Sequence, residues 1–190
     1  MGSPGSEIWA WRHPRPTGID GHCIGRTDVA VDPRRARRLA RRIERAARQY
    51  GLPHVVWTSP LRRCADVGRW LKRRGWTHHI DNALLEMDFG VWEGLPWSVI
   101  PEAEVEVWNR DFAHHAPGGG ESLVDVLARA AGWQAPDLAI VVAHSGWMRA
   151  RRWLESAREA PDLAAQFPAS PAYGALWKLR PPVVLPAWSR

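Results

Sequence analysis

The chain has 190 residues, of which 45% are hydrophobic and 24% charged, and its formal net charge is +6. A chain of this length buries roughly 70% of its surface on folding, which predicts a single domain over residues 1–190 with a substantial core. No run approaches the ~20 apolar residues that a membrane-spanning helix needs. These features exclude a membrane-spanning protein and predict a soluble globular protein without a membrane partner.

The N-terminus and the cysteines indicate the cellular setting. Residues 1–6 are small and polar and lack the basic and apolar regions of a secretion signal. We expect them to be a disordered tail or a cloning remnant. Cys23 and Cys64 do not have CxxC spacing and could form at most one bridge. Both observations favour a reduced, cytoplasmic protein.

Strands and helices alternate along the predicted chain. An apolar strand over residues 7–12 leads into a glycine-containing loop over 14–32, after which Asp32 and Pro33 begin a helix that ends near 50. The later elements are a strand at 54–58, a helix at 60–74, a strand at 78–81, a loop at 83–101, a helix from 102 that breaks at 117–120, a helix at 121–133, a strand at 138–143, a helix from 145, and a strand at 172–179 before a proline-punctuated tail. This alternation predicts an α/β fold, a three-layer α/β/α sandwich with a largely parallel central sheet.

Arginine is concentrated in the predicted helix that follows Asp32. The residues are Arg34, Arg35, Arg37, Arg38, Arg41, Arg42, Arg45 and Arg48. They are interleaved with Leu39, Ile43 and Ala46 at helical spacing, which is typical of a surface helix with one buried stripe. A pI near 10.3 also raises nucleic-acid binding as an alternative. We favour a solvated face and do not expect a nucleic-acid partner.

Polar residues follow three of the predicted strands. Arg12 and His13 end the first strand, Ser59–Arg63 follows the second, and His144–Gly146 follows the strand at 138–143. Because ligands bind at the carboxyl ends of parallel strands, we expect these clusters to meet at one edge of the sheet. Histidines beside arginines suit an anion better than a metal ion, and phosphate in particular pairs with guanidinium groups. A neutral imidazole can attack phosphorus, while a partly screened carboxyl protonates the leaving group.

Four motifs, in order along the chain, resemble those of the histidine phosphatase superfamily in its phosphoglycerate mutase-like branch. They are Arg12-His13-Pro14, Ser59-Pro60-Leu61-Arg62-Arg63, Leu85-Glu86-Met87-Asp88-Phe89-Gly90-Val91-Trp92-Glu93-Gly94 and His144-Ser145-Gly146. The segment at 117–122 also resembles the family's Pro-Gly-Gly-Glu-Ser segment. The matches span residues 8–149, and four spaced motifs are a highly specific signal.

The resemblance implies a phosphomonoesterase that acts on a small phosphate ester without a metal or an organic cofactor. His13 would attack phosphorus to give a phosphohistidine, and Glu86 would protonate the leaving group and then activate water. Asp88 and Glu93 are alternatives for the acid. The residues implied around the phosphoryl group or the substrate are Arg12, Arg63, His144, Ser145, Gly25 and Arg26.

One segment suggests a substrate. Residues 21–29 resemble the Gly-x-Cys-Tyr-Gly-Arg-x-Asp segment of alpha-ribazole phosphatases, which act late in cobalamin synthesis. This resemblance implies alpha-ribazole 5′-phosphate as the substrate. The chain departs from the family at Pro14, where glycine is usual, and at Ile24, where the alpha-ribazole group tends to have tyrosine. Because proline fixes φ, Pro14 is expected to reshape the entry to the leaving-group pocket.

Three other functions compete with this hypothesis. A broad-specificity phosphatase shares the same chemistry. A mutase must retain the phosphoryl group, and no feature of the sequence predicts that water is excluded. A non-catalytic module that uses the arginine-rich helix to bind nucleic acid would be favoured by the loss of His13, Glu86 or His144, and all three are present. The oligomeric state is not indicated by the sequence.

Overall fold

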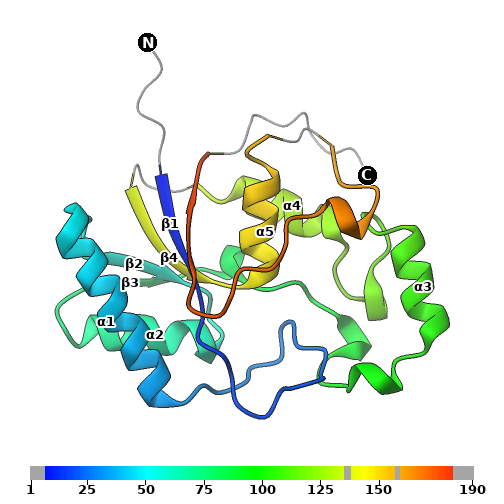
Figure 1. Ribbon diagram of the computed structural model, residues 1–190, viewed down its shortest axis with the longest axis horizontal. Helices are drawn as coiled ribbons and strands as arrows, with labels where there is room; N and C mark the ends of the chain where they lie inside the picture. The colour runs from blue at the N-terminus through cyan, green and yellow to red at the C-terminus, as the bar shows by residue number, and fades with distance from the viewer. Residues whose placement is uncertain (1–6, 135–137, 157–158, 182–190) are drawn as a thin grey trace.

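The structure is a computed structural model that describes residues 7–134, 138–156 and 159–181. The expected N-terminal tail at 1–6 and most of the proline-punctuated C-terminal tail lie outside these described residues. Figure 1 shows a central sheet with helices on both of its faces. The predicted α/β sandwich is confirmed.

The sheet has five strands in the order β3-β2-β4-β1-β5. They are β1 (Glu7–Arg12), β2 (Val55–Thr58), β3 (Thr77–Ile80), β4 (Leu138–Ala143) and β5 (Leu176–Leu179). The first four run parallel, and β5 pairs antiparallel with β1. The strands β1 and β4 read as nearly continuous apolar runs because they lie in the middle of the sheet and are covered on both faces.

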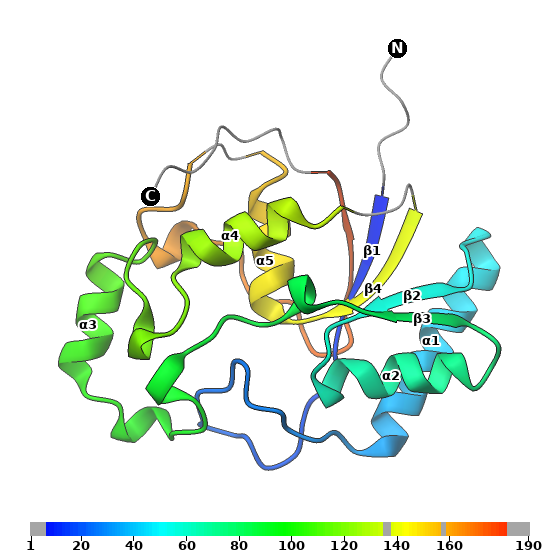
Figure 2. The same cartoon turned by 180° about the vertical axis from the view of Figure 1, so that it is seen from behind.

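Two hydrophobic cores separate the sheet from its helices. The helices are α1 (Pro33–Tyr50), α2 (Arg62–Lys72), α3 (Glu102–Arg110), α4 (Leu123–Gly132) and α5 (Ser145–Trp153). Alternate residues of β1 serve the two cores: Trp9 and Trp11 pack with α1 and α2, whereas Ile8 and Ala10 pack with α4 and α5. Figures 1 and 2 show α1 and α2 on one side of the sheet, α4 and α5 on the other, and α3 at the far end of the molecule.

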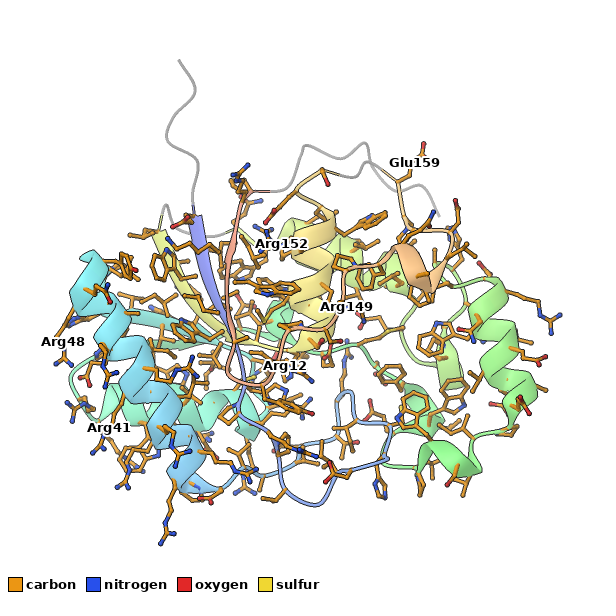
Figure 3. The ribbon with its side chains drawn as sticks, in the orientation of Figure 1. Arg12, Arg41, Arg48, Arg149, Arg152 and Glu159 are labelled. Atoms are coloured by element: carbon orange, nitrogen blue, oxygen red, sulfur yellow. The ribbon has the colours of Figure 1, made fainter. Side chains whose placement is uncertain are left out.

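The arginine-rich helix α1 has the predicted boundaries. The Asp32 carboxylate accepts a hydrogen bond from the Arg34 N–H, and Gly51 ends the helix with φ +63°. The apolar residues of the buried stripe are Ala36, Leu39, Ala40, Ile43 and Ala47, while Ala46 is only half-buried. All eight arginines are exposed, and Figure 3 shows Arg41 and Arg48 projecting away from the molecule. None of the helices in the described ranges is long and apolar enough to cross a membrane.

Three predicted elements are clearly shorter in the structure. The helix expected from residue 102 to the break at 117 ends at Arg110, because Asp111 leaves helical geometry with φ −128° and ψ 59°. The helix expected at residue 60 begins at Arg62, because Ser59 and Pro60 form a turn in which the Ser59 hydroxyl accepts from the Leu61 N–H at 3.2 Å. The strand expected from residue 172 begins at Leu176. A turn at Gly174, with φ +71°, precedes it, and the Gly174 N–H donates to the Arg12 carbonyl at 3.1 Å. Both turns lie beside the carboxyl ends of the central strands.

Candidate active site

A cavity of about 610 Å³ lies at the carboxyl ends of β1 and β4. Its lining includes Arg12, His13, Arg63, Glu86 and Ser145. The sequence predicted that these residues come together, although they lie as far as 133 positions apart. We define the charged end of the cavity as the part formed by these five residues.

The His13 ring is held in one tautomer. It is 4% exposed, and its Nδ1 lies 2.8 Å from the Pro14 carbonyl oxygen. A carbonyl can only accept, so Nδ1 carries the proton and Nε2 keeps a free electron pair. Burial lowers the pKa of His13 well below its usual value, and the nearby positive charge of Arg63 lowers it further. His13 is therefore neutral near pH 7. Proline at position 14 does not disturb the tautomer, because the His13 ring hydrogen-bonds only to the carbonyl of that residue.

The Arg63 guanidinium is buried and lies between the histidines and the loop at 25–27. It is 1% exposed; its Nε donates to His144 Nδ1 at 3.1 Å, and its Nη atoms donate to the carbonyls of Thr27, at 2.7 Å, and Gly25. These contacts use three of its five N–H donors. No carboxylate forms an ion pair with Arg63 within the described ranges. Two donors and a full positive charge thus remain for an anion.

His144 lies behind His13 and Arg63 and does not line the cavity. Its ring centroid is 5.1 Å from that of His13. Because Nδ1 accepts from Arg63, Nε2 carries the proton and donates to the Ser59 hydroxyl at 2.8 Å. Burial and the charge of Arg63 lower the pKa of His144 well below its usual value. His144 lies beside the cavity residues, as predicted, but both of its ring nitrogens form hydrogen bonds with protein groups.

Two buried donors on residues that line the cavity have no partner in the described part of the chain. Arg12 donates from Nη1 to the Pro171 carbonyl at 2.6 Å and stacks on Tyr173, with Cζ 3.9 Å from the ring centroid. Its Nε has no partner, and neither does the hydroxyl of Ser145. Buried donors are nearly always satisfied in native proteins, and these two, on neighbouring cavity residues, suit the acceptor oxygens of a ligand.

Glu86 contributes the carboxylate of the charged end. Its Oε2 accepts from the Gly146 N–H at 3.0 Å and its Oε1 accepts from the Met87 N–H at 3.1 Å. A Cβ atom on residue 146 would lie 2.1 Å from Glu86 Oε1, so only glycine allows this approach. The start of α5 therefore positions Glu86 beside Ser145 and Arg12.

The two alternatives for the acid, Asp88 and Glu93, bind groups of the surrounding loops instead. Glu93 accepts hydrogen bonds from the N–H groups of Gly25, Arg26, Thr27 and Phe89 and from the Thr27 hydroxyl. Burial raises the pKa of Glu93, but these hydrogen bonds outweigh burial and leave the pKa below its usual value. Asp88 accepts from the Gly90 N–H at 2.8 Å and pairs with Arg26 at 3.3 Å. Neither carboxylate lines the cavity.

Gly25 and Arg26, predicted to bind the substrate, do not line the cavity. A Cβ on Gly25 would lie 2.1 Å from the Met87 carbonyl oxygen, so Gly25 is needed for close packing of two loops. Arg26 forms ion pairs with Asp88 and, at 3.4 Å, with Glu121. Within the segment at 21–29 only His22 and Ile24 line the cavity. Most of the residues that resemble those of alpha-ribazole phosphatases therefore pack the loops around the cavity and do not line it.

Sequence reasoning missed two arginines that complete the site. Arg149 lines the cavity, and its place one turn after Ser145 on α5 was a usable signal, because residues four apart share a helix face. Arg129 binds Glu121 at 2.9 Å and the Ala83 and Leu85 carbonyls at 3.0 and 2.8 Å, which fixes the segment before Glu86. No local pattern marks Arg129. In Figure 3, Arg12 and Arg149 lie near the centre of the molecule.

A largely parallel sheet whose first strand ends in a neutral histidine between arginines suits the binding of a phosphoryl group. The family model for the histidine phosphatase superfamily (branch 1) matches residues 8–170. The chain belongs to this superfamily.

Several known proteins with similar sequences or folds are mycobacterial. Glucosyl-3-phosphoglycerate phosphatase of Mycobacterium tuberculosis is 36% identical over 118 residues, which are 52% of each chain. A vanadate complex of the mycobacterial enzyme of that name has a TM-score of 0.70 at 25% identity and covers 91% of this chain and 90% of its own. A structure called mycobacterial hydrolase 1 has a TM-score of 0.72 at 24% identity and covers 92% and 89%. The chain spans from 23% to 52% of the length of the curated relatives that it matches.

The buried neutral histidines predict that stability falls in acid. The unfolded chain takes up protons on His13 and His144 below about pH 6.5, whereas the folded chain does not, so the free energy of unfolding decreases as the pH falls from 6.5. In His13→Gln, the slope of this decrease between about pH 6.5 and 5 should be smaller by up to about 1 kcal/mol per pH unit. Urea unfolding at several pH values measures both slopes. Equal slopes in the two proteins would contradict a neutral His13.

Proposed function

We propose that the chain is a phosphomonoesterase that works through a phosphohistidine on His13. The observation that carries this proposal is the His13 tautomer. Nδ1 lies 2.8 Å from the Pro14 carbonyl oxygen and carries the proton, which leaves the electron pair of Nε2 free. Arg12, Arg63 and Ser145 line the same cavity and have N–H or O–H groups that suit phosphoryl oxygens. Phosphatases among the similar proteins support this chemistry.

In the first step, His13 Nε2 attacks phosphorus while the bond from phosphorus to the ester oxygen breaks. Glu86 donates a proton to that oxygen, and the alcohol leaves. The guanidinium groups of Arg12 and Arg63 stabilise the negative charge on the other phosphoryl oxygens. His144 holds the Nε of Arg63 at 3.1 Å, so in this scheme it is a positioning residue for the phosphoryl group.

In the second step, water attacks the phosphorus of the phosphohistidine. The ionised Glu86 takes a proton from that water, the nitrogen–phosphorus bond breaks, and inorganic phosphate leaves. His13 returns to its neutral form with the proton still on Nδ1. Every group in this scheme belongs to the protein, the substrate or water, so neither a metal ion nor an organic cofactor enters it.

The proposed substrate is alpha-ribazole 5′-phosphate, on the resemblance of residues 21–29. Two alternatives compete with it: a broad range of small phosphate esters, and glucosyl-3-phosphoglycerate, the substrate named for a relative. Phosphate release from these compounds and from an aryl phosphate tests the proposal, with His13→Ala as the control. A strong preference for alpha-ribazole 5′-phosphate is the expected result. Comparable rates on all esters would favour broad specificity, and inactivity on all of them would contradict the phosphatase.

Glu86→Gln tests the proton donor. The amide cannot give a proton to the leaving oxygen, so turnover of alkyl phosphates should fall about 10²- to 10⁴-fold. Aryl phosphates with good leaving groups should lose much less in the first step. Rates measured on a series of esters give this dependence, with the exposed Glu102→Gln as a matched control. Equal losses on aryl and alkyl esters would show that Glu86 is not the acid.

Gly146→Ala should displace Glu86 without unfolding the protein. The added Cβ meets the far end of a flexible side chain, the Glu86 carboxylate, which can move away at little cost in stability. Turnover of alkyl phosphates should fall by roughly tenfold to 100-fold, as one proton-transfer group is misplaced. Gly132→Ala is the matched control, because nothing lies within 4 Å of its Cβ. A melting temperature that drops while activity persists would contradict this account.

A further inference from the structure

Beyond its charged end, the cavity is lined largely by aromatic side chains. We define the aromatic wall as Phe89, Trp97, Trp108, Phe112 and Phe167, all of which line the cavity. Phe89 meets Trp97 and Trp108 edge to face, with centroids 6.2 and 5.9 Å apart. Trp108 lies 5.8 Å from Phe112, which lies 6.2 Å from Phe167. The wall is thus one continuous series of rings.

The wall is assembled from three separate parts of the chain and is held in place by polar contacts. Trp108 lies on α3, which Figure 1 shows at the end of the molecule remote from α1. The Trp92 Nε1 donates to Glu104 on the same helix at 2.8 Å and ties α3 to the acid-bearing loop. Arg149 stacks over Phe167, with Cζ 4.4 Å from the ring centroid, where the wall meets the charged end. The wall therefore faces the position of a leaving group.

The few polar groups in this part of the cavity argue against a leaving group that consists of sugar alone. Apart from the charged residues, the side chains there that can form good hydrogen bonds are His22, Trp97, Trp108, Asn109, Ser170 and Tyr173. Each hydroxyl of a buried sugar needs a partner, and an unpaired hydroxyl costs about 1–3 kcal/mol. A wall of rings gains most from an apolar, flat group that covers it.

Trp108 also offers one unused donor. Its Nε1 is buried and has no partner among the described residues. The Nε1 atoms of Trp57, Trp76 and Trp147 share this property, but they do not line the cavity. Trp108 is thus the one of these four tryptophans that lines the cavity.

From these observations we infer that the leaving group of the substrate carries a planar aromatic ring with a hydrogen-bond acceptor, which packs on the aromatic wall and accepts from Trp108 Nε1. This inference rests on the proposed function and narrows its substrate class. It assigns the wall to specificity, and it leaves proton transfer and nucleophilic attack to the charged end.

Matched esters with the same primary alkoxide leaving oxygen test the ring. We expect kcat/KM for 3-phenylpropyl phosphate to exceed that for 3-cyclohexylpropyl phosphate by about threefold to tenfold, from aromatic packing geometry. Glycerol 1-phosphate, which is a polyol ester, should fall below both by on the order of 100-fold. Equal values for the phenyl and cyclohexyl esters, or a preference for the polyol, would overturn the inference.

Trp108→Phe tests the donor because it keeps a ring and removes the N–H. Its kcat/KM should fall about tenfold more for 3-(pyridin-3-yl)propyl phosphate than for 3-phenylpropyl phosphate, mainly through KM. Trp76→Phe, which removes an equally unpartnered N–H from the core beside α1 and α2, should change neither value. Equal losses on the two esters in Trp108→Phe would overturn the role of this donor.

The two proposals fail in different ways. If all of these esters are hydrolysed equally well and His13→Ala is inactive, the phosphatase stands and the aromatic specificity is wrong. If no ester is hydrolysed, or if His13→Ala hydrolyses them like the natural chain, the proposed function itself is wrong.

Discussion

His13→Ala is expected to reduce kcat by a factor on the order of 10⁴ or more, on every phosphate ester that the natural chain hydrolyses. Alanine removes the atom that bonds to phosphorus, and the other ring near it cannot replace that atom. Both nitrogens of His144 are engaged, by Arg63 at 3.1 Å and by Ser59 at 2.8 Å. Initial rates of phosphate release at saturating ester measure the loss.

The control for this variant is His114→Ala, which removes an exposed histidine. Its kcat should stay within about twofold of the natural value, as expected for a surface substitution. Thermal unfolding of both variants shows whether they fold. A folded His13→Ala protein that keeps more than a small percentage of its activity would contradict a nucleophilic His13.

Arg63→Met is expected to lower kcat/KM by about 10²- to 10³-fold, through loss of charge stabilisation in the transition state. The substitution also removes the hydrogen bond to His144 and the contacts to the Thr27 and Gly25 carbonyls, which join the histidines to the loop. Arg62→Met is a closely matched control, because Arg62 is the neighbouring arginine and is exposed. Steady-state kinetics of both variants give the comparison.

Arg63→Lys separates charge from geometry. Lysine keeps the positive charge, but its single ammonium group cannot reproduce the planar fork that reaches three partners and still leaves donors for phosphate. We expect it to lose nearly as much activity as Arg63→Met. Full activity in Arg63→Lys would show that charge alone is needed and that the arrangement around His144 is not.

The fold and the charged end of the cavity were largely predictable from the sequence. Strand–helix alternation predicts a parallel sheet, and the carboxyl ends of parallel strands meet at one edge, which brings His13, Arg63 and Ser145 together. Glu86 followed from its motif position. The strand predicted from residue 172 was too long, because an apolar run does not reveal the turn at Gly174 that returns the chain toward Arg12.

The roles of individual loop residues were harder to predict. Gly25 and Arg26 resemble binding residues in sequence, but their surroundings show that they hold the loop against Met87 and Asp88. The engagement of both His144 nitrogens depends on the side chains of Arg63 and Ser59, which lie about 80 positions away in the sequence. Such roles come from tertiary contacts that leave no periodic pattern.

The aromatic wall illustrates the same limit. Its rings come from the acid-bearing loop, from α3 and the turn after it, and from a turn near residue 167. The thirteen tryptophans in the sequence gave no indication of which rings pack in a core and which face a ligand. Only the packing of α3 against the loop shows that Trp108 lines the cavity, whereas Trp147 on α5 is buried in the core.

Detection of the phosphohistidine tests the central claim most directly. The natural chain is mixed with a radiolabelled phosphate ester, quenched in alkali during turnover and digested, because phosphoramidate bonds survive alkali and break in acid. We predict an acid-labile label on the peptide that contains His13, and none in His13→Ala. Turnover without any label, or a label on a peptide that lacks His13, would contradict the account.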